Sequence, residues 1–242
     1  MAADRAASPP RLVSGPIPGV GKPRLSEAFR SGSLPANQHL VKTIIAAGLL
    51  LFLLGVSPLL AGAPQTVELT AYPFQKSVLE VQLGAGAFFS IGDRQTMNYA
   101  SESLRFGWMF SDIHGGGLLR GNWEGLLELF SGEVFVGPGN FFAGGSLIGR
   151  YNFVQEQARF VPYFQLGAGA LGDNIYRNKN QRLVGSGFEF LLRTGLGFRW
   201  SINRNWAFFT EGEYQHISNA DTASRNIGLN ALGVTVGVSR FF

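Results

Sequence analysis

The sequence predicts an all-β protein, an eight-stranded antiparallel transmembrane β-barrel preceded by a signal peptide. Three observations support this fold class. Of the 242 residues, 33 are glycine and only 15% are charged, whereas average soluble domains carry about 7% glycine and about 25% charged residues. One long apolar run stands near the N-terminus. The sequence after that run alternates between apolar and polar residues, in segments long enough to cross an outer membrane.

The N-terminal apolar run predicts export from the cytoplasm. Residues 43–60 contain no charge, Lys42 precedes them and Ala61-Gly62-Ala63 follows. A basic flank, an apolar stretch and a triplet of small residues are typical of a secretory signal peptide, which we place at residues 41–63. A membrane-spanning helix is the alternative, because 18 residues reach the lower limit for a span. Glycine and proline within the run favour the signal peptide.

The first 40 residues differ from the rest of the chain. They are rich in Pro, Gly, Ser and Ala and show no apolar periodicity, so we expect a disordered or non-native extension. They are also longer than the usual charged leader of a signal peptide, which indicates that translation starts at Val41. The barrel is then expected to occupy residues 64–242.

Charge and cysteine content exclude several functions. Residues 1–63 carry all of the formal charge of +4, and from Pro64 onward 14 basic residues balance 14 acidic ones. Nucleic-acid binding therefore lacks its main electrostatic support. The absence of cysteine excludes disulfides and thiolate metal sites, and three histidines leave little room for zinc. We expect neither a metal nor a cofactor.

The barrel strands follow from alternation with a period of two. Phe188, Phe190 and Leu192 share one face of the sixth segment, while Glu189 and Arg193 share the other. Stretches bearing Gly, Asn and Asp separate the segments, as hairpin connections require. The predicted strands are 77–89, 99–110, 122–135, 141–153, 161–171, 187–200, 206–218 and 228–242.

A soluble β-sandwich is the alternative architecture, because alternation alone does not separate it from a barrel. The export signal, the low charge content and the terminal Phe242 favour the barrel in the outer membrane of a Gram-negative bacterium. A last strand that ends in phenylalanine resembles the signal that the barrel assembly machinery recognises. Because eight strands enclose only side chains, we expect the inward charges to pair within a packed lumen. These charges are Glu80, Arg105, Glu124, Glu128, Arg150, Glu189, Arg193, Glu211 and Glu213.

A polar pair at the end of the seventh strand is the candidate for chemistry. Trp206, Phe208 and Tyr214 place His216 and Ser218 on the lipid-facing side of that strand. Cβ atoms two residues apart lie about 6–7 Å from each other, so the imidazole can reach the hydroxyl. A polar girdle at the membrane interface would explain the same two residues without any function.

The surrounding residues resemble the lipid A 3-O-deacylase (acyloxyacyl hydrolase-like) family. His216-Ile217-Ser218-Asn219-Ala220, followed by Asn226-x-Gly228 and a last strand that ends in phenylalanine, carry the resemblance over about thirty residues. The family consists of eight-stranded outer-membrane barrels that hydrolyse an ester-linked acyl chain of lipopolysaccharide. The resemblance implies a serine esterase whose partners are lipid A and membrane lipids.

The resemblance also implies roles for individual residues. Ser218 would be the nucleophile and His216 the general base. Asn219 and Asn226 would help to stabilise the oxyanion. Gly228 would allow a backbone conformation that other residues rarely adopt. The sequence departs from the family at Asn230, which stands where the family has a glutamate that orients the histidine. An amide can orient imidazole but stabilises imidazolium less than a carboxylate does.

Basic residues in the loop between the fifth and sixth strands are candidates for substrate binding. Arg177, Lys179 and Arg182 cluster there, with Arg94 and Arg225 in neighbouring loops. Guanidinium groups bind phosphates well, so these residues can meet the phosphates of lipid A. Attraction to an anionic membrane surface without a defined site explains the same cluster equally well. At the level of function, the alternative is a non-catalytic structural or adhesive barrel.

Overall fold

The structure is a computed structural model, and it describes residues 72–242 except 93–94 and 157–158. The predicted extension (1–40) and signal peptide (41–63) lie outside the described residues and stay predictions. Each predicted strand is present, with ends within two residues of the expected positions. The strands are β1 (Leu79–Ser90), β2 (Asn98–Met109), β3 (Asn122–Val136), β4 (Phe141–Asn152), β5 (Phe160–Asp173), β6 (Phe188–Ser201), β7 (Trp206–Ser218) and β8 (Leu229–Phe241).

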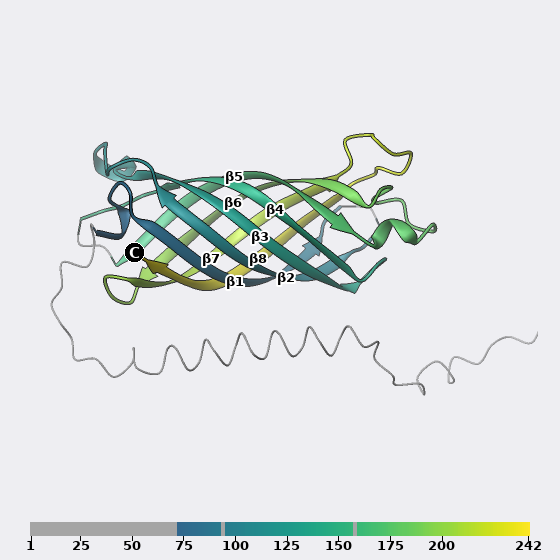
Figure 1. The fold of residues 1–242 in the computed structure, drawn as a ribbon, viewed down its shortest axis with the longest axis horizontal. Coiled ribbons are helices and arrows are strands. Elements are labelled where there is room, and N and C mark those ends of the chain that lie inside the picture. The colour runs from purple at the N-terminus through teal and green to yellow at the C-terminus, as the bar shows by residue number, and fades with distance from the viewer. Residues whose placement is uncertain (1–71, 93–94, 157–158) are drawn as a thin grey trace, which may run out of the picture. The chain divides into compact units, whose positions relative to one another are not determined.

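The eight strands form a closed antiparallel barrel. Each strand pairs with the next along the chain, and β8 pairs with β1 through a register that sets Gly84 opposite Gly237. The strands are strongly tilted against the barrel axis, as Figure 1 shows. Closure leaves no sheet edge unpaired, which is the arrangement that a membrane requires of strands. The sandwich alternative is therefore wrong.

The outer surface of the barrel is apolar. Leucine and valine side chains, among them Leu127, Leu147 and Val234, are about half exposed along the middle of the strands. One end of the barrel carries an aromatic belt of exposed side chains, which includes Trp108, Trp123, Trp200 and Phe242. An apolar band with an aromatic belt at its margin is the surface that a transmembrane barrel presents to lipid.

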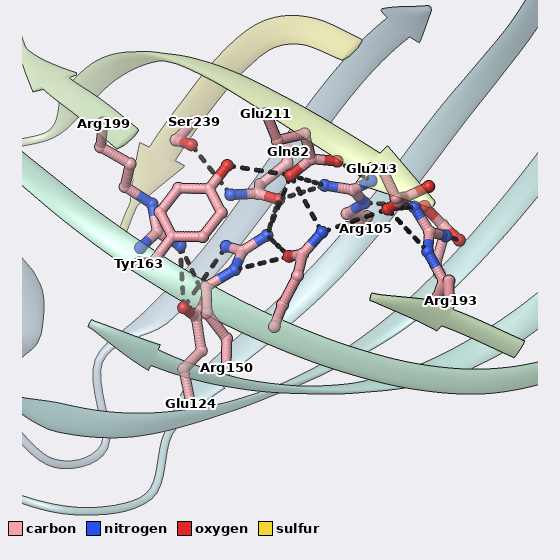
Figure 2. A network of polar contacts seen from close by, with 12 residues as sticks. Gln82, Arg105, Glu124, Arg150, Tyr163, Arg193, Arg199, Glu211, Glu213 and Ser239 are labelled. Atoms are coloured by element: carbon pink, nitrogen blue, oxygen red, sulfur yellow. Dashed lines mark hydrogen bonds and ion pairs between the residues drawn. The ribbon is translucent and has the colours of Figure 1, made fainter. Parts of the chain in front are cut away.

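The lumen is filled by interlocked charged side chains (Figure 2). Each inward arginine contacts at least one glutamate. The ion pairs join Arg105 to Glu128 and Glu211, Arg150 to Glu124 and Glu211, Arg193 to Glu128 and Glu213, and Arg199 to Glu80 and Glu124. Gln82, Gln165 and Tyr163 add hydrogen bonds to the network. The predicted pairing is confirmed for eight of the nine inward charges, while Glu189 lies apart at one end of the barrel.

The two ends of the barrel carry different connections. The connections 91–97, 137–140, 174–187 and 219–228 leave from one end, which we call the long-loop end. Below these loops the lumen is closed by an apolar cluster that includes Tyr99, Phe142, Leu183, Val184 and Ile217. Of the connections at the other end, the one between β6 and β7 spans only residues 202–205.

Three short 3-10 helices complete the described fold: η2 (Tyr72–Phe74), η3 (Gly117–Leu119) and η4 (Ile175–Arg177). The long connection between β2 and β3 is ordered by η3 and by a bridge between His114 and Gly121. The Tyr151 hydroxyl donates to Leu119 O at 2.7 Å and ties this connection to β4. None of the helices in the described part of the chain has the length and apolarity to cross a membrane.

Candidate active site

The candidate site lies on the outer surface of β7 and β8 beside the long-loop end. Side chains along β7 alternate between buried and partly exposed, and His216 and Ser218 are on the partly exposed, outward side. In the β7–β8 ladder His216 stands opposite Asn230, whose side chain also faces outward. In the β6–β7 ladder Ser218 stands opposite Phe190. The barrel thus holds three polar side chains against its apolar surroundings.

His216 is held by a hydrogen bond to Asn230. The distance between His216 Nδ1 and Asn230 Oδ1 is 2.6 Å. Since the amide oxygen only accepts, Nδ1 carries the ring proton in the neutral imidazole. The second ring nitrogen, Nε2, is then left with a lone pair. This is the tautomer that a general base needs in order to take a proton from a hydroxyl group.

Tyr214 is a member of this cluster that the sequence interpretation gave no role. Its hydroxyl donates to Asn230 Oδ1 at 2.8 Å, so the amide oxygen accepts two hydrogen bonds at once. Tyr214 lies two residues before His216 on the outward side of β7. That shared parity is visible in the sequence. The contact itself depends on the β7–β8 register and on the length of the tyrosine side chain.

Ser218 is the last residue of β7 and is partly exposed. Within the described residues its hydroxyl makes no hydrogen bond, so it is not engaged by His216 in this structure. The two residues are separated by one position on the same side of the strand, which places their Cβ atoms about 6–7 Å apart. Catalytic hydrogen bonds are often long in a free enzyme and tighten when the substrate is bound.

A tight turn follows Ser218 directly. The Thr222 N–H donates to Asn219 O at 3.1 Å, and the two central residues have positive φ angles, 50° at Ala220 and 61° at Asp221. Left-handed backbone at two successive non-glycine residues is uncommon and costs free energy. Among the described residues, the N–H groups of Ala220 and Asp221 meet no acceptor. Sequence reasoning missed this turn, because neither residue is a glycine.

The residues expected to stabilise an oxyanion lie inside the loop that begins at this turn. The Asn219 backbone N–H donates to Asn226 Oδ1 at 2.9 Å, and the Asn219 side-chain amide donates to Arg225 O at 3.0 Å. The Asn226 amide donates to Asp221 Oδ1 at 2.8 Å. Gly228 has a φ of 75° and donates its N–H to Leu183 O at 2.9 Å. The structure brings Asn219 and Asn226 together, with these donors engaged in ordering the loop.

Arg225 holds two of the long loops together. Its guanidinium group donates to the backbone carbonyls of Tyr176, Asn178 and Gln181 at 2.8, 2.9 and 3.2 Å. These carbonyls belong to the connection between β5 and β6, whereas Arg225 belongs to the connection between β7 and β8. Arg225 was a candidate for phosphate binding, but in the structure its donors stabilise the loops beside the site. Arg94, the other candidate, lies outside the described residues.

The remaining basic candidates are exposed on the loop between β5 and β6. Arg177 and Lys179 each lie about 6 Å from the ring centre of Tyr176, at 5.9 and 6.0 Å. The Arg182 backbone N–H donates to Gln95 Oε1 at 3.2 Å, and its side chain is exposed. The structure thus gathers all three on one loop at the long-loop end.

An apolar depression leads along the outer surface toward the cluster. It crosses β4 to β7 and is lined by Leu147, Leu166, Gly167, Ala168, Leu192, Arg193, Thr194 and Tyr214. Leu192 stands opposite His216 and Thr194 opposite Tyr214 in the β6–β7 ladder. The small side chains at positions 167 and 168 leave room between larger leucines. The depression is open to the exterior along the barrel wall.

No three His, Cys, Asp or Glu side chains within residues 72–92, 95–156 and 159–242 converge in a way that would hold a metal ion. The outward cluster itself offers a hydroxyl, an imidazole and an amide. Together these groups suit proton transfer and nucleophilic attack.

Comparisons with known proteins give one family match and several similar structures. A protein-family model described as lipid A 3-O-deacylase (PagL) matches residues 97–239. The structure of the outer membrane enzyme PagL is 19% identical, with 65% of this chain and 97% of that chain covered and a TM-score of 0.49. The structure of Neisserial surface protein A (NspA) is 14% identical, with 69% of this chain and 100% of that chain covered and a TM-score of 0.48. The structure of the outer membrane protein OprG from Pseudomonas aeruginosa is 16% identical, with 70% of this chain and 98% of that chain covered and a TM-score of 0.45.

A search of curated protein sequences returns no match. The family model covers more than half of the chain, including β3 to β7 in full and the outward cluster of β7 and β8. The chain therefore belongs to the lipid A 3-O-deacylase family and is a β-barrel protein of the Gram-negative outer membrane.

Proposed function

We propose that this protein is a serine esterase that removes an ester-linked acyl chain from lipid A in the outer leaflet. The observation that carries the proposal is the 2.6 Å contact between His216 Nδ1 and Asn230 Oδ1 on the lipid-facing surface, two residues before a partly exposed serine. Burying polar groups against hydrocarbon has a cost unless they find partners or serve a function. Membership of the family supplies the substrate class.

The reaction follows the logic of a serine hydrolase. His216 Nε2 takes the proton of the Ser218 hydroxyl while Oγ forms a bond to the ester carbonyl carbon. The tetrahedral intermediate collapses, the bond to the sugar oxygen breaks, and the imidazolium returns its proton to that oxygen. Water then attacks the acyl-enzyme, with His216 again as base, and the fatty acid leaves. No step requires a cofactor or a metal ion.

Negative charge develops on the ester carbonyl oxygen and has to be stabilised. The family resemblance assigns this role to Asn219 and Asn226, with Gly228 shaping the backbone. In addition, we assign it to the N–H groups of Ala220 and Asp221, which directly follow Ser218–Asn219 and have no acceptor among the described residues. The backbone strain at these two residues supports the assignment, because strain of this kind gathers at active sites.

Asn230 makes the proposed triad weaker than one with a carboxylate. The amide keeps imidazole in the correct tautomer, but it carries no charge to stabilise the imidazolium that forms during the reaction. In a serine protease, the same exchange of a carboxylate for its amide lowers kcat by about 10⁴, largely because the tautomer is wrong. Here the amide oxygen faces the ring and the Tyr214 hydroxyl donates to it, so we expect a smaller loss.

The substrate is held by its chains and by its phosphates. The apolar depression between Leu147 and Tyr214 is suited to an acyl chain that lies along the barrel wall. Arg177, Lys179 and Arg182 are exposed at the long-loop end, where they can pair with lipid A phosphates. Phe242, exposed beyond the end of β8, is proposed to be the contact with the barrel assembly machinery.

Mass spectrometry of lipid A tests the proposal. Cells that express the wild-type protein should contain lipid A that is lighter by one acyl chain, and Ser218→Ala or His216→Ala should abolish this change. Ser201→Ala is the matched control, since Ser201 is buried at the opposite end of β6. All variants should retain heat-modifiable migration on gels. Equal lipid A profiles in all strains would favour a non-catalytic barrel whose outer loops bind a partner.

A further inference from the structure

We propose that the long-loop end holds a binding site for a hard divalent cation, formed by Asp173, Glu189 and Asn219. These residues come from three neighbouring strands. Asp173 is the last residue of β5, Glu189 is the second residue of β6, and Asn219 directly follows β7. Carboxylates and amide carbonyls are the ligands that Ca²⁺ prefers in proteins. The site would lie under the loop that follows the proposed nucleophile.

The strand registers bring the three side chains to one place. Phe190 stands opposite Ser218, so the next residues along the two strands, Glu189 and Asn219, also face each other. Leu171 stands opposite Glu189, which places Asp173 on the adjacent diagonal. Directly opposed Cβ atoms are about 4.5–5.5 Å apart and diagonal ones about 7–8 Å. Asp173 is close enough to repel the Glu189 carboxylate, and the Asn219 side chain is close enough to donate a hydrogen bond to it.

In each of the three side chains, one polar atom forms hydrogen bonds to nearby backbone groups and one oxygen has no partner. Asp173 Oδ1 accepts the N–H groups of Ile175 and Tyr176 at 2.7 and 3.1 Å. Glu189 Oε1 accepts the Ser186 N–H at 3.2 Å, and the Asn219 amide donates to Arg225 O at 3.0 Å.

The oxygens left over are Asp173 Oδ2, Glu189 Oε2 and Asn219 Oδ1. They are buried and have no hydrogen-bond partner, and in the described part of the chain no other buried side-chain atom shares this state. Glu189 and Asn219 are fully buried, with 0% of each residue exposed. A buried polar atom without a partner is rare, and the strand registers bring the residues that carry these three oxygens to neighbouring positions. A cation bound between the three residues would satisfy these oxygens together.

Charge gives an independent argument. The inward glutamates of the lumen, Glu80, Glu124, Glu128, Glu211 and Glu213, each form an ion pair with an arginine. Glu189 and Asp173 have no such partner among the described residues, and they repel each other. An uncompensated buried charge costs several kcal/mol. A divalent cation would neutralise both carboxylates and bind their free oxygens.

Occupancy of this site would stiffen two loops. Asp173 and Glu189 bind the backbone at the two ends of the connection between β5 and β6, and Asn219 begins the turn that contains Ala220 and Asp221. The inference is independent of the proposed esterase activity, because it concerns binding and stability in the absence of substrate.

Terbium luminescence tests the binding directly. Tb³⁺ replaces Ca²⁺ in oxygen sites, and Tyr176, whose N–H binds Asp173, would sensitise its emission. The folded wild-type barrel in detergent should show Tb³⁺ emission that Ca²⁺ displaces at about 10⁻⁴–10⁻³ M, the range of extracellular calcium modules. Glu189→Gln and Asp173→Asn should each lose it. Glu133→Gln, which removes a carboxylate from the outer end of β3, should retain it. Equal emission in all four proteins, or none in the wild type, would overturn the proposal.

Thermal unfolding gives a second test, in which the wild type and Glu189→Gln should respond differently to Ca²⁺. In the presence of a chelator, Glu189→Gln should unfold at the same temperature as the wild type or higher, since the amide removes a repelling charge. Addition of Ca²⁺ should raise the Tm of the wild type by several degrees and leave that of Glu189→Gln unchanged. A wild-type Tm that does not respond to Ca²⁺, or a variant that responds equally, would contradict the site.

Discussion

Asn230 stands directly opposite His216 in the β7–β8 ladder, and its side-chain oxygen lies 2.6 Å from the imidazole Nδ1. In place of the glutamate that the family resemblance implies at this position, an amide therefore makes the same contact with the ring. Compared with a carboxylate at this position, the amide keeps a contact with the ring and carries no negative charge. Substitutions of Asn230 can therefore separate the effect of orienting the His216 ring from the effect of a negative charge beside it.

Asn230→Glu is expected to raise the deacylation rate by at least about tenfold, because a carboxylate stabilises the imidazolium that forms in the transition state. The rate is measured as kcat on purified lipid A in mixed micelles. Asn230→Ala serves as the comparison and should lower kcat, since it removes the acceptor for Nδ1–H. A Glu variant that is no faster than the wild type would show that Asn230 does not act as the third member.

Tyr214→Phe is expected to lower kcat by about fivefold to tenfold, which corresponds to the loss of one hydrogen bond of about 1 kcal/mol. The hydroxyl favours the amide orientation in which Oδ1 faces the ring. A carboxylate has oxygen on both sides, so the effect of Tyr214→Phe should shrink in the Asn230→Glu background. This double-mutant cycle separates orientation from simple packing, because a packing defect would lower kcat equally in both backgrounds.

Arg225→Ala should release the connection between β5 and β6 without unfolding the barrel. The guanidinium group donates to three carbonyls of this loop, and no other residue type offers so many donors in a fixed fork. We expect faster proteolysis within residues 174–187 and unchanged heat-modifiable migration. Arg225→Lys is the matched control, because it retains the charge but not the fork, and it should show an intermediate cleavage rate. Wild-type resistance in both variants would argue against the role of Arg225.

Glu211→Gln should destabilise the barrel by about 1.5–3 kcal/mol, because it weakens charged hydrogen bonds in the lumen, while Arg105 keeps its pair with Glu128 and Arg150 its pair with Glu124. Glu211 accepts hydrogen bonds from Arg105, Tyr163 and Gln165 within the lumen. Figure 2 shows Glu211 beside Arg105 and Tyr163. Equilibrium unfolding in urea from detergent or lipid vesicles measures the change. Glu133→Gln, on the outer side of β3, should alter stability by no more than about 0.5 kcal/mol.

The sequence was sufficient to predict the barrel because strands that face lipid on one side and a packed lumen on the other must alternate. Strand β7 was predicted with the bounds that the structure has, and the other strands differ by at most two residues. The outward side of His216, Ser218 and Asn230 also follows from parity. Their catalytic roles rest on the family resemblance and await measurement.

Loop structure was not predictable, because it depends on contacts between distant segments. Arg225 contacts carbonyls more than forty residues earlier in the chain, at Tyr176, Asn178 and Gln181. The left-handed turn at Ala220 and Asp221 lacks the glycine that normally marks such a turn. The outward tyrosine that contacts Asn230 is one of several aromatic residues on the barrel wall, and only the strand register identifies it.

The pairs within the lumen have a consequence for how the barrel is built. Arg199 and Glu80 are 119 positions apart, and Arg105 and Glu211 are 106 positions apart. These pairs cross the lumen between strands that are not neighbours in the barrel, so they form only when β8 pairs with β1 and the barrel closes. A partly assembled sheet would expose these charges to hydrocarbon, so open intermediates are unfavourable. Insertion into the bilayer is therefore expected to proceed as a nearly all-or-none event that ends when the seam closes.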